Sequence, residues 1–505
     1  MRASNRIIVN TFAQYVRTII NILLSLYSSR LVLEILGVDD YGIYSLVAGV
    51  VTMLSFFTNS LVGSTQRFLS VSQGKGDIDN LKIVFGSSVL LHILLGFIVL
   101  LILEACTPFL FNGFLNIPEE RIGAAINIYQ LVILMVYISF IAAPYKALLI
   151  SRENIVYTSI IDVIDGVLKV VLVIFLQYIT FDKLVAYGYI TLLISIFNLA
   201  AYVIYPSLKY EECILPRFRY FDLKYIKKLF SFTSWIIYAA ASVALRNQGI
   251  AIVLNKFFGA AINAAYGIGG QISGMCSFLS SSFDNAVSPQ LMASAGGNNR
   301  ERMLYLTEIG SKFPFLLISM IGIPTLFEMQ FLLELWLINV PEYTVYFGAT
   351  FLLMQIVDQL SIGLATTNKA MGNIGVYIFV TVTPKLFILP LGWIVLEHGF
   401  SLKLLCLLMI FIEFICMLLR VFLLRKMPGF NAWKFCNNVM LKSLPPVVLS
   451  VVACYLISNY IDSNLRFICT YVISIIVFLS SSYMFALSKR EKDIVDGIML
   501  KFIKK

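Results

Sequence analysis

Residues 10–42 read NTFAQYVRTIINILLSLYSSRLVLEILGVDDYG. This run is long and apolar enough to cross a bilayer, which takes about 20 mostly apolar residues. Arg17, Arg30 and Glu34 nevertheless lie within it. A charge inside a spanning helix is costly in lipid, so these side chains indicate a wet cavity or a charged partner. The run ends at Gly37–Gly42, a short acidic turn before the next apolar run.

The composition is typical of a helical membrane protein. Of the 505 residues, 59% are hydrophobic and 13% are charged, whereas soluble chains carry about 25% charged residues. The alternating strands of about ten residues that mark membrane β-barrels are not seen. We therefore predict an all-α polytopic membrane protein with about fourteen transmembrane helices. The predicted spans are 7–35, 41–71, 83–111, 123–148, 155–180, 184–206, 229–258, 262–293, 305–335, 343–367, 376–397, 401–424, 441–461 and 465–487.

Lys and Arg gather in alternate short loops, above all in residues 207–228 and 488–505. Basic residues concentrate on the cytoplasmic side of membrane proteins, so we place both termini in the cytoplasm. The net charge of +10 then follows from topology, and we expect no nucleic-acid partner.

A spacing pattern in the first half of the chain returns in the second. Each half carries a Gly, a Tyr-Gly pair, a Gln and a polar, Gly-containing loop, in that order. With six spans in each half, both halves have the same orientation, which predicts pseudo-symmetry about an axis along the membrane normal. The matching positions are Gly37, Tyr41-Gly42, Gln66 and 74–77 in the first half, and Gly259, Tyr266-Gly267, Gln290 and 296–299 in the second.

This repeat sets the predicted domain organisation, in which two six-helix lobes precede an additional helix pair. We predict an N-terminal lobe at 1–206, a basic cytoplasmic linker at 207–228, a C-terminal lobe at 229–425, a cytoplasmic linker at 426–440, the helix pair at 441–487 and a basic cytoplasmic tail at 488–505.

Four basic residues lie deep within predicted spans: Arg17, Lys169, Arg246 and Lys385. Arg17 and Arg246 occupy the leading helix of each half, and arginine binds phosphate oxygens bidentately. They are therefore candidates for a cavity that holds an anionic substrate, and Lys385 joins them. The alternative is that each Arg pairs with a neighbouring carboxylate for packing. Five further basic residues near the inner ends of spans are expected to snorkel to the headgroups: Arg67, Lys146, Lys312, Arg420 and Lys442.

Four acids within the spans are candidates for ion coupling or for a charge switch: Asp162, Asp165, Asp284 and Asp358. Asp165 stands four residues before Lys169, so the two predict an ion pair on one helix face, with Asp162 one turn earlier. This group is either a self-neutralised ladder or part of an ion site. Asp358 is expected to pair with Lys385, and Asp284 to meet Arg246 across a cavity.

The opening run with Arg17, the stretch LGVDDYGIY at 36–44 and the Gly-rich loop after the second span resemble polysaccharide flippases. These are the O-antigen and capsule transporters of the multidrug/oligosaccharidyl-lipid/polysaccharide exporter superfamily. The resemblance implies a lipid-linked oligosaccharide with a pyrophosphate headgroup, moved by alternating access across the bacterial cytoplasmic (inner) membrane. Arg17, Arg246 and Lys385 would face that headgroup, and a proton or sodium ion would couple transport. We expect a monomer without metal or cofactor.

Two other functional classes are alternatives. A multidrug or cation exporter of the same superfamily would rely on acidic cavity residues, and the four acids keep that alternative open. A membrane enzyme would need a large outer loop with catalytic groups, and every predicted outer loop is short. His92 and His398 lie in or beside apolar runs, and the eight cysteines include no CxxC pair. We therefore expect a transporter and not an enzyme.

Overall fold

The computed structural model describes residues 3–111, 117–213, 222–258, 260–337, 340–372, 374–425, 427–461, 465–493 and 496. In these ranges the chain forms helices and no strands. Contacts divide it into an N-terminal unit, Ile8–Ile237 with Met292–Asn298, and a C-terminal unit, Met1–Ile7, Tyr238–Leu291 and Asn299–Lys505. The two are described separately. The predicted lobe limits at 206 and 229 stay predictions.

Residues 10–42 lie in one long helix that is broken once. Within α1 (Ala3–Lys75), Gly37 has φ 79° and ψ 173°, which lies outside the helical region. Glycine takes a positive φ without the steric cost of a Cβ atom. The break falls between the first two predicted spans, and it separates two helices of spanning length. At the corresponding place in the second half, α6 ends at Phe258 and α7 begins at Ala260, while Gly259 lies outside the described residues.

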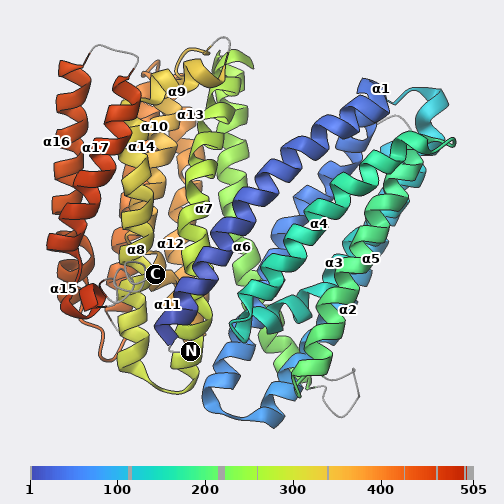
Figure 1. Cartoon of the computed structure of the whole chain (residues 1–505), viewed down its shortest axis with the longest axis horizontal. Coiled ribbons are helices and arrows are strands. Elements are labelled where there is room, and N and C mark those ends of the chain that lie inside the picture. The colour runs from blue at the N-terminus through green and yellow to red at the C-terminus, as the bar shows by residue number, and fades with distance from the viewer. Residues whose placement is uncertain are drawn as a thin grey trace. The chain divides into compact units, whose positions relative to one another are not determined.

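The N-terminal unit is a helical bundle in which α3 packs against both α2 and α5, and α4 packs against α5 (Figure 1). Its core centres on Tyr129, Ile128 and Val132 of α3, with Ile43 of α1 and Leu184 of α5. The elements are α2 (Ile78–Phe109), η2 (Glu119–Arg121), α3 (Ile122–Ser151), α4 (Ile155–Phe175), η3 (Leu176–Tyr178) and α5 (Lys183–Lys209), with α1 before them and the first part of α6 (Leu223–Phe258) after them.

The C-terminal unit packs α14 against α10 and α12, and packs the terminal pair α16 and α17 against each other and against α8 (Figure 1). Phe315 and Ile323 of α8 meet Cys454 of α16 and Phe478 of α17 in a core cluster. The elements are α7 (Ala260–Gly296), α8 (Arg300–Phe327), α9 (Met329–Trp336), α10 (Thr344–Gln359), α11 (Ile362–Met371), α12 (Gly375–Leu386), α13 (Ile388–Glu397), α14 (Leu402–Leu424), α15 (Ala432–Phe435), η5 (Cys436–Met440), η6 (Leu441–Ser443), α16 (Leu444–Tyr460), α17 (Arg466–Ser481) and η7 (Ser482–Ala486).

The first two predicted spans lie in α1, on either side of Gly37. Each later predicted span coincides, within the described ranges, with one helix or with two helices in series. Among the described residues, 9 helices are long and apolar enough to cross a membrane, or 10 if α10 and α11, bent by 49°, form one span. The helix α4 is not among them, since Asp162, Asp165 and Lys169 place three charges within its 21 residues. The chain is an all-α polytopic membrane protein, as the composition predicts.

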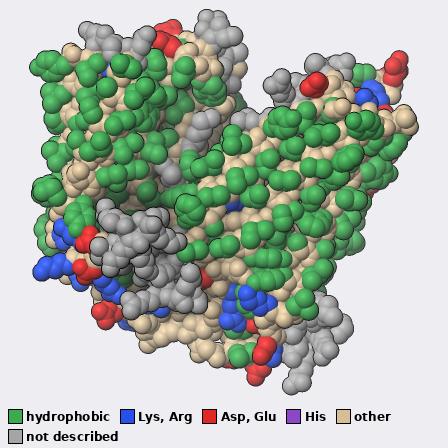
Figure 2. Space-filling model, in the orientation of Figure 1, with side chains coloured by type: hydrophobic (Ala, Val, Ile, Leu, Met, Phe, Trp, Pro, Cys, Tyr) green, Lys and Arg blue, Asp and Glu red, His purple; other side chains and the backbone are tan. Residues whose placement is uncertain are grey.

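The helices present apolar side chains outward as well as inward. In the most apolar window of α2, only 22% of the residues are buried inside the protein. Figure 2 shows hydrophobic side chains over much of the visible length of the helices, while charged side chains stand mostly near helix ends. This distribution suits helices whose sides contact lipid and whose ends contact water and headgroups.

The polar, Gly-containing loops of the repeat meet inside the N-terminal unit. A Cβ atom added to Gly74 would lie 1.9 Å from the backbone oxygen of Ala293, and one added to Gly296 would lie 1.9 Å from that of Val71. Side chains are therefore excluded on both faces of this contact. The ends of α1 and α7 approach each other here as closely as backbones can.

Two predicted linkers are partly helical. The helix α6 begins at Leu223, inside the predicted linker 207–228, of which 214–221 lies outside the described residues. The predicted linker 426–440 contains α15 and η5. Of the predicted tail, residues 497–505 lie outside the described residues.

Candidate functional site

A cavity of about 690 Å³ opens within the C-terminal unit. Four charged side chains line it from four helices, two cationic and two anionic: Arg246 of α6, Asp358 of α10, Lys385 of α12 and Glu413 of α14. The lining also includes Tyr266, Phe351 and five uncharged polar residues: Asn247, Gln248, Gln271, Ser273 and Gln355.

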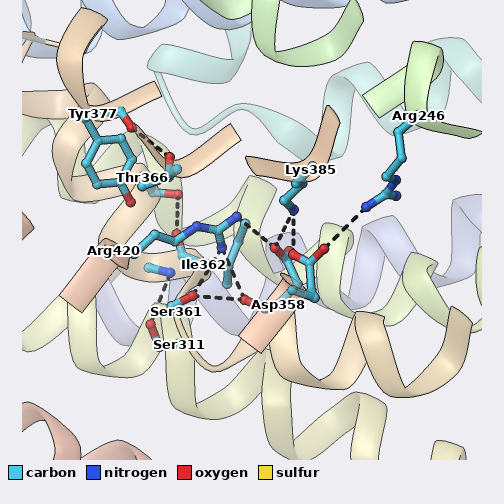
Figure 3. Close-up of polar contacts among 12 residues, drawn as sticks. Arg246, Ser311, Asp358, Ser361, Ile362, Thr366, Tyr377, Lys385 and Arg420 are labelled. Carbon is cyan, nitrogen blue, oxygen red and sulfur yellow. Dashed lines mark hydrogen bonds and ion pairs between the residues drawn. The ribbon is translucent and has the colours of Figure 1, made fainter. Parts of the chain in front are cut away.

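Glu413 is the acceptor on which two of these cations converge. Arg246 Nη1 lies 3.3 Å from its Oε2, and Lys385 Nζ lies 2.5 Å from its Oε1. Lys385 Nζ also lies 3.5 Å from Asp358 Oδ1. The Glu413 side chain is 3% exposed, so water screens these contacts little. Figure 3 shows Lys385 and Arg246 near each other, with Asp358 below Lys385.

Arg420 extends the cluster behind the cavity lining. Its Nη2 donates to Asp358 Oδ1 at 2.8 Å, and its Nη1 donates to Ser361 Oγ at 3.1 Å (Figure 3). Asp358 stands just before the bend between α10 and α11. Three cations thus face two carboxylates, which leaves this buried cluster with a formal charge of +1.

Local sequence explains how three of these side chains are placed. Pro384 lies within the last turn of α12, and the helix ends at Leu386 before α13 begins at Ile388. Proline lacks an N–H and disturbs a helix, so Lys385 sits at a break between two helices. Glu413 and Arg420 are seven residues apart on α14, which places both on the same face.

The N-terminal unit holds a second charged group. Arg17 Nη1 lies 2.7 Å from Asp162 Oδ2 of α4, and Tyr202 of α5 donates to Asp162 Oδ1 at 3.1 Å. The side chains of Arg17 and Asp162 are 25% and 24% exposed. A cavity of about 460 Å³ is lined by both, with Asn21 beside them.

Asp165 has partners of its own in this unit. Lys169 Nζ lies 2.7 Å from Asp165 Oδ2, and Asn198 donates to Asp165 Oδ1 at 2.6 Å. Asp162, Asp165 and Lys169 line a further cavity of about 360 Å³. Arg17 and Lys169 balance Asp162 and Asp165, so this group is neutral as a whole.

At another place in the N-terminal unit, Arg121 of η2 joins two acids. Its Nη1 lies 2.6 Å from Asp182, which caps α5 by accepting from the Leu184 and Val185 amides, and its Nη2 lies 2.5 Å from Asp40. Partial burial acts to raise the pKa of Asp182. The hydrogen bonds and the charge of Arg121, with the two amides, outweigh burial and hold that pKa below its ordinary value.

The sequence model of the family described as "Polysaccharide biosynthesis protein" matches residues 5–293, which is more than half of the chain. This chain belongs to that family. The resemblance to polysaccharide exporters is thereby confirmed. No curated protein matches the chain.

Solved structures of membrane transporters share the fold of this polysaccharide biosynthesis protein. A MATE transporter in the bent conformation has a TM-score of 0.74 at 14% identity, covering 87% of this chain and 97% of its own. A Vibrio cholerae MATE transporter gives 0.70 at 16%, covering 86% and 98%. A MOP superfamily transporter from Pyrococcus furiosus, described as having a binding pocket of reverse polarity, gives 0.71 at 12%, covering 84% and 95%. At these identities the likeness concerns the fold.

The structure brings together several side chains that the sequence singled out. Lys385 approaches Asp358, and Lys169 pairs with Asp165 at the predicted i,i+4 spacing. Arg17 and Arg246 each contact a carboxylate, as in the packing alternative, and each also lines a cavity. Their roles toward a substrate stay predictions.

The predicted partner of Arg246 is wrong. Arg246 contacts Glu413 and not Asp284, whose Oδ1 accepts a hydrogen bond from Thr366 of α11 at 3.2 Å. Asp284 stands on α7 and Glu413 on α14, and it is α14 that supplies the acid in contact with the guanidinium. Asp284 does not line the cavity that contains Arg246.

Three basic residues expected to snorkel are buried instead. Arg67 is 6% exposed, and its guanidinium lies over the rings of Phe68 and Phe232. Arg420 is 7% exposed within the cluster, and Lys312 is 2% exposed with its Nζ 2.9 Å from Glu491 Oε2, beyond the last span. A carboxylate within reach removes the need to extend toward headgroups. Sequence reasoning also missed Glu413, although an acid in the middle of an apolar span is itself a signal of function.

Proposed function

We propose that this chain translocates a lipid-linked oligosaccharide of the undecaprenyl-pyrophosphate type across the bacterial cytoplasmic membrane by alternating access. The product would serve O-antigen, capsule or another surface polysaccharide, which fits the family of polysaccharide biosynthesis proteins. The fold is shared with membrane transporters, and the C-terminal unit holds a charged cavity. Both observations support transport over catalysis.

The observation that carries the proposal is the sharing of Glu413 between two cations. The contact with Arg246, at 3.3 Å, is longer than the contact with Lys385, at 2.5 Å. If Arg246 turns to a phosphate oxygen, Glu413 keeps Lys385 as its partner. The exchange therefore avoids leaving a buried carboxylate unpaired, which would be the costly outcome.

The formal charge of the cluster also suits an anion. Three cations and two carboxylates leave +1 before a substrate enters. Arg246 and Lys385 act on the pyrophosphate in this proposal, with Asp358 and Arg420 holding Lys385 and the bend of α10 in place. Arg17 takes a corresponding part in the N-terminal unit after release from Asp162.

Asp162 is the best placed of the four acids for ion coupling. Its carboxylate holds Arg17, and the residue lines three cavities of the N-terminal unit. Protonation would remove its charge and free Arg17, whereas Asp165 would keep Lys169. Asp358 serves the charge cluster, and Asp284 is a further candidate. With the inside negative, the membrane potential favours outward movement of an anion by about 2.3 kcal/mol per negative charge per 100 mV.

A multidrug or cation exporter is the second candidate, because multidrug MATE transporters share the fold. The acids Asp162 and Asp165 in the cavities of the N-terminal unit favour it. A cationic substrate would compete with Arg17 and Lys169 for these acids, whereas a pyrophosphate would compete with the acids for the cations.

A genetic experiment separates the two candidates. The gene is deleted in its own bacterium, and lipid-linked oligosaccharide is measured on each leaflet of the cytoplasmic membrane. We expect accumulation on the inner leaflet and loss of surface glycan, both restored by the wild-type gene and not by Arg246→Gln. Normal glycan with raised sensitivity to cationic drugs would instead support the exporter.

A further inference from the structure

The helical segment Ala432–Tyr460, which contains α15 and α16, presents an apolar stripe on the outside of the protein. Trp433, Leu444 and Val448 are 75%, 49% and 54% exposed, and their helical spacing places them on one face. Tryptophan concentrates at the level of the lipid headgroups. Figure 1 shows α15 at one end of the pair α16 and α17, the end predicted to be cytoplasmic. Trp433 therefore marks the depth of the headgroups at that end.

Two lysines stand beside this stripe without a carboxylate partner. Lys434 is exposed next to Trp433, and Lys442 is half-buried, with its Nζ 2.9 Å from Asn438 Oδ1. Among the described residues, neither ammonium forms an ion pair. A lysine ammonium can donate three hydrogen bonds, so both remain available to an anion from outside the chain.

The other end of the same helix pair is different. Arg466, at the start of α17, directs its Nε and Nη2 to the two carboxylate oxygens of Glu328, at 3.2 and 3.1 Å. The Glu328 side chain is 1% exposed. The cation at that end is thus neutralised within the protein, whereas Lys434 and Lys442 are not.

The surroundings of the two lysines carry an excess of positive charge. Contacts with α8 bring the neighbouring groups together: Asn438 Nδ2 donates to Glu308 at 3.2 Å, and Arg490 Cζ lies 4.3 Å from the ring centroid of Tyr305. Four cations here face two carboxylates, a formal charge of +2: Lys312, Lys434, Lys442 and Arg490 against Glu308 and Glu491. The nearby chain adds no further net charge, because it contains Lys489 and Lys492 with Asp493 and Asp496.

We propose that Trp433, Lys434 and Lys442 form a binding site for the headgroup of an anionic phospholipid of the cytoplasmic leaflet. The ammonium groups of the lysines bind the phosphate, the indole lies at the depth of the headgroup, and the acyl chains follow Leu444 and Val448. A ligand with both an anionic head and apolar chains matches both parts of this surface, whereas a soluble anion matches only the lysines. The inference depends on the membrane fold and not on the transported substrate.

The C-terminal unit offers a matched pair of lysines for the test. Lys256 lies over the ring of Trp393 at 4.3 Å, and Lys403 over that of Tyr346 at 4.8 Å. Both are exposed, and both stand at the end predicted to face outward. The double variants Lys434→Gln with Lys442→Gln and Lys256→Gln with Lys403→Gln therefore remove the same charge from opposite ends of one unit.

The purified full chain is titrated in detergent with dioleoyl phosphatidylglycerol and with dioleoyl phosphatidylcholine, and the bound lipid is counted by native mass spectrometry. We expect wild type to prefer phosphatidylglycerol, with a preference that falls as salt is raised. Removing both Lys434 and Lys442 should weaken phosphatidylglycerol binding by about 25-fold, about fivefold for each lysine, and leave phosphatidylcholine binding unchanged. Trp433→Ala should weaken the binding of both lipids alike.

The control double variant at Lys256 and Lys403 should bind both lipids as wild type does, and Lys434→Arg with Lys442→Arg should keep the preference. Inorganic phosphate at the concentration of the lipid should not displace phosphatidylglycerol, because it has no chains to contact the apolar stripe. If the glutamine double variant fails to fold, Lys434→Gln alone should show the fivefold loss, since this exposed side chain forms no ion pair.

Equal affinities of wild type for the two lipids would overturn the site and leave the lysines to a soluble anion or an acidic protein. Equal losses in the two glutamine double variants would also overturn it, because the effect would then be one of net charge and not of place. Displacement of phosphatidylglycerol by inorganic phosphate would assign the lysines to a soluble phosphate and contradict the lipid site.

Discussion

The guanidinium of Arg246 on α6 contacts the carboxylate of Glu413 on α14 at 3.3 Å, across 167 positions of sequence. The same carboxylate holds Lys385 at 2.5 Å. One acid therefore fixes two cations from different helices around a cavity. We expect the stability of the C-terminal unit to depend on this shared acceptor.

Removing that acceptor should destabilise the protein. Glu413→Gln would leave three cations with one carboxylate, and breaking a buried ion pair in this way costs about 3–5 kcal/mol. We expect a clear fall in the thermal midpoint of the detergent-solubilised protein. The double variant Glu413→Gln with Lys385→Met should recover part of it, because one of the cations in excess over the remaining carboxylate is gone. A single variant as stable as wild type would show that the cluster is not held by Glu413.

Asp162 and Arg17 should control the response to a proton gradient. Asp162→Asn mimics the neutral acid and leaves Arg17 without its 2.7 Å partner. We expect its transport rate in proteoliposomes to lose dependence on an imposed pH difference, while a potential still drives it. Asp165→Asn is the matched control, since Asp165 pairs with Lys169 and not with Arg17. An unchanged pH response in Asp162→Asn would exclude it from proton coupling.

Replacing a glycine by alanine should lower the thermal stability at the contacting ends of α1 and α7, but not elsewhere in the same helices. Gly74→Ala and Gly296→Ala would place a Cβ atom 1.9 Å from a backbone oxygen, whereas Gly63 of α1 and Gly274 of α7 have no atom within 4 Å of theirs. We expect the first two to lower the thermal midpoint. Ala has the higher helix propensity, by up to about 1 kcal/mol, so the second two should be neutral or stabilising. Similar midpoints for all four would refute the close contact.

The Arg121 cluster should add a pH-dependent term to stability. Because the pKa of Asp182 is lowered in the folded protein, its contribution is present above the ordinary value of about 3.9 and is lost as the pH falls through the folded pKa. Asp182→Asn should therefore lower the thermal midpoint at neutral pH. The gap from wild type should narrow as the pH falls below about 4. A gap that is constant with pH would show that the charge of Asp182 is not the cause.

Hydropathy and residue spacing along the chain were enough to predict the helices and the ion pair between Asp165 and Lys169. Hydropathy locates the spans, Gly37 marks the break in α1, and the four-residue spacing of Asp165 and Lys169 gives their contact. The partner of Arg246 lies on a helix that is distant in sequence, and periodicity within one helix carries no information about that choice. Snorkelling was expected for Arg420 because it lies near the inner end of its predicted span. Its partner Asp358 stands on a different helix, so the pattern within one span could not show the ion pair.

The proposed function is tested most directly by the rate at which the purified protein flips a polyprenyl-pyrophosphate-linked oligosaccharide in proteoliposomes. Wild type should move the lipid between leaflets well above the protein-free rate, Arg246→Gln should be slowed by at least about tenfold, the loss of one charged contact, and Arg246→Lys should lie between them. Flipping at the protein-free rate by a folded wild type, or equal rates in wild type and Arg246→Gln, would contradict the account.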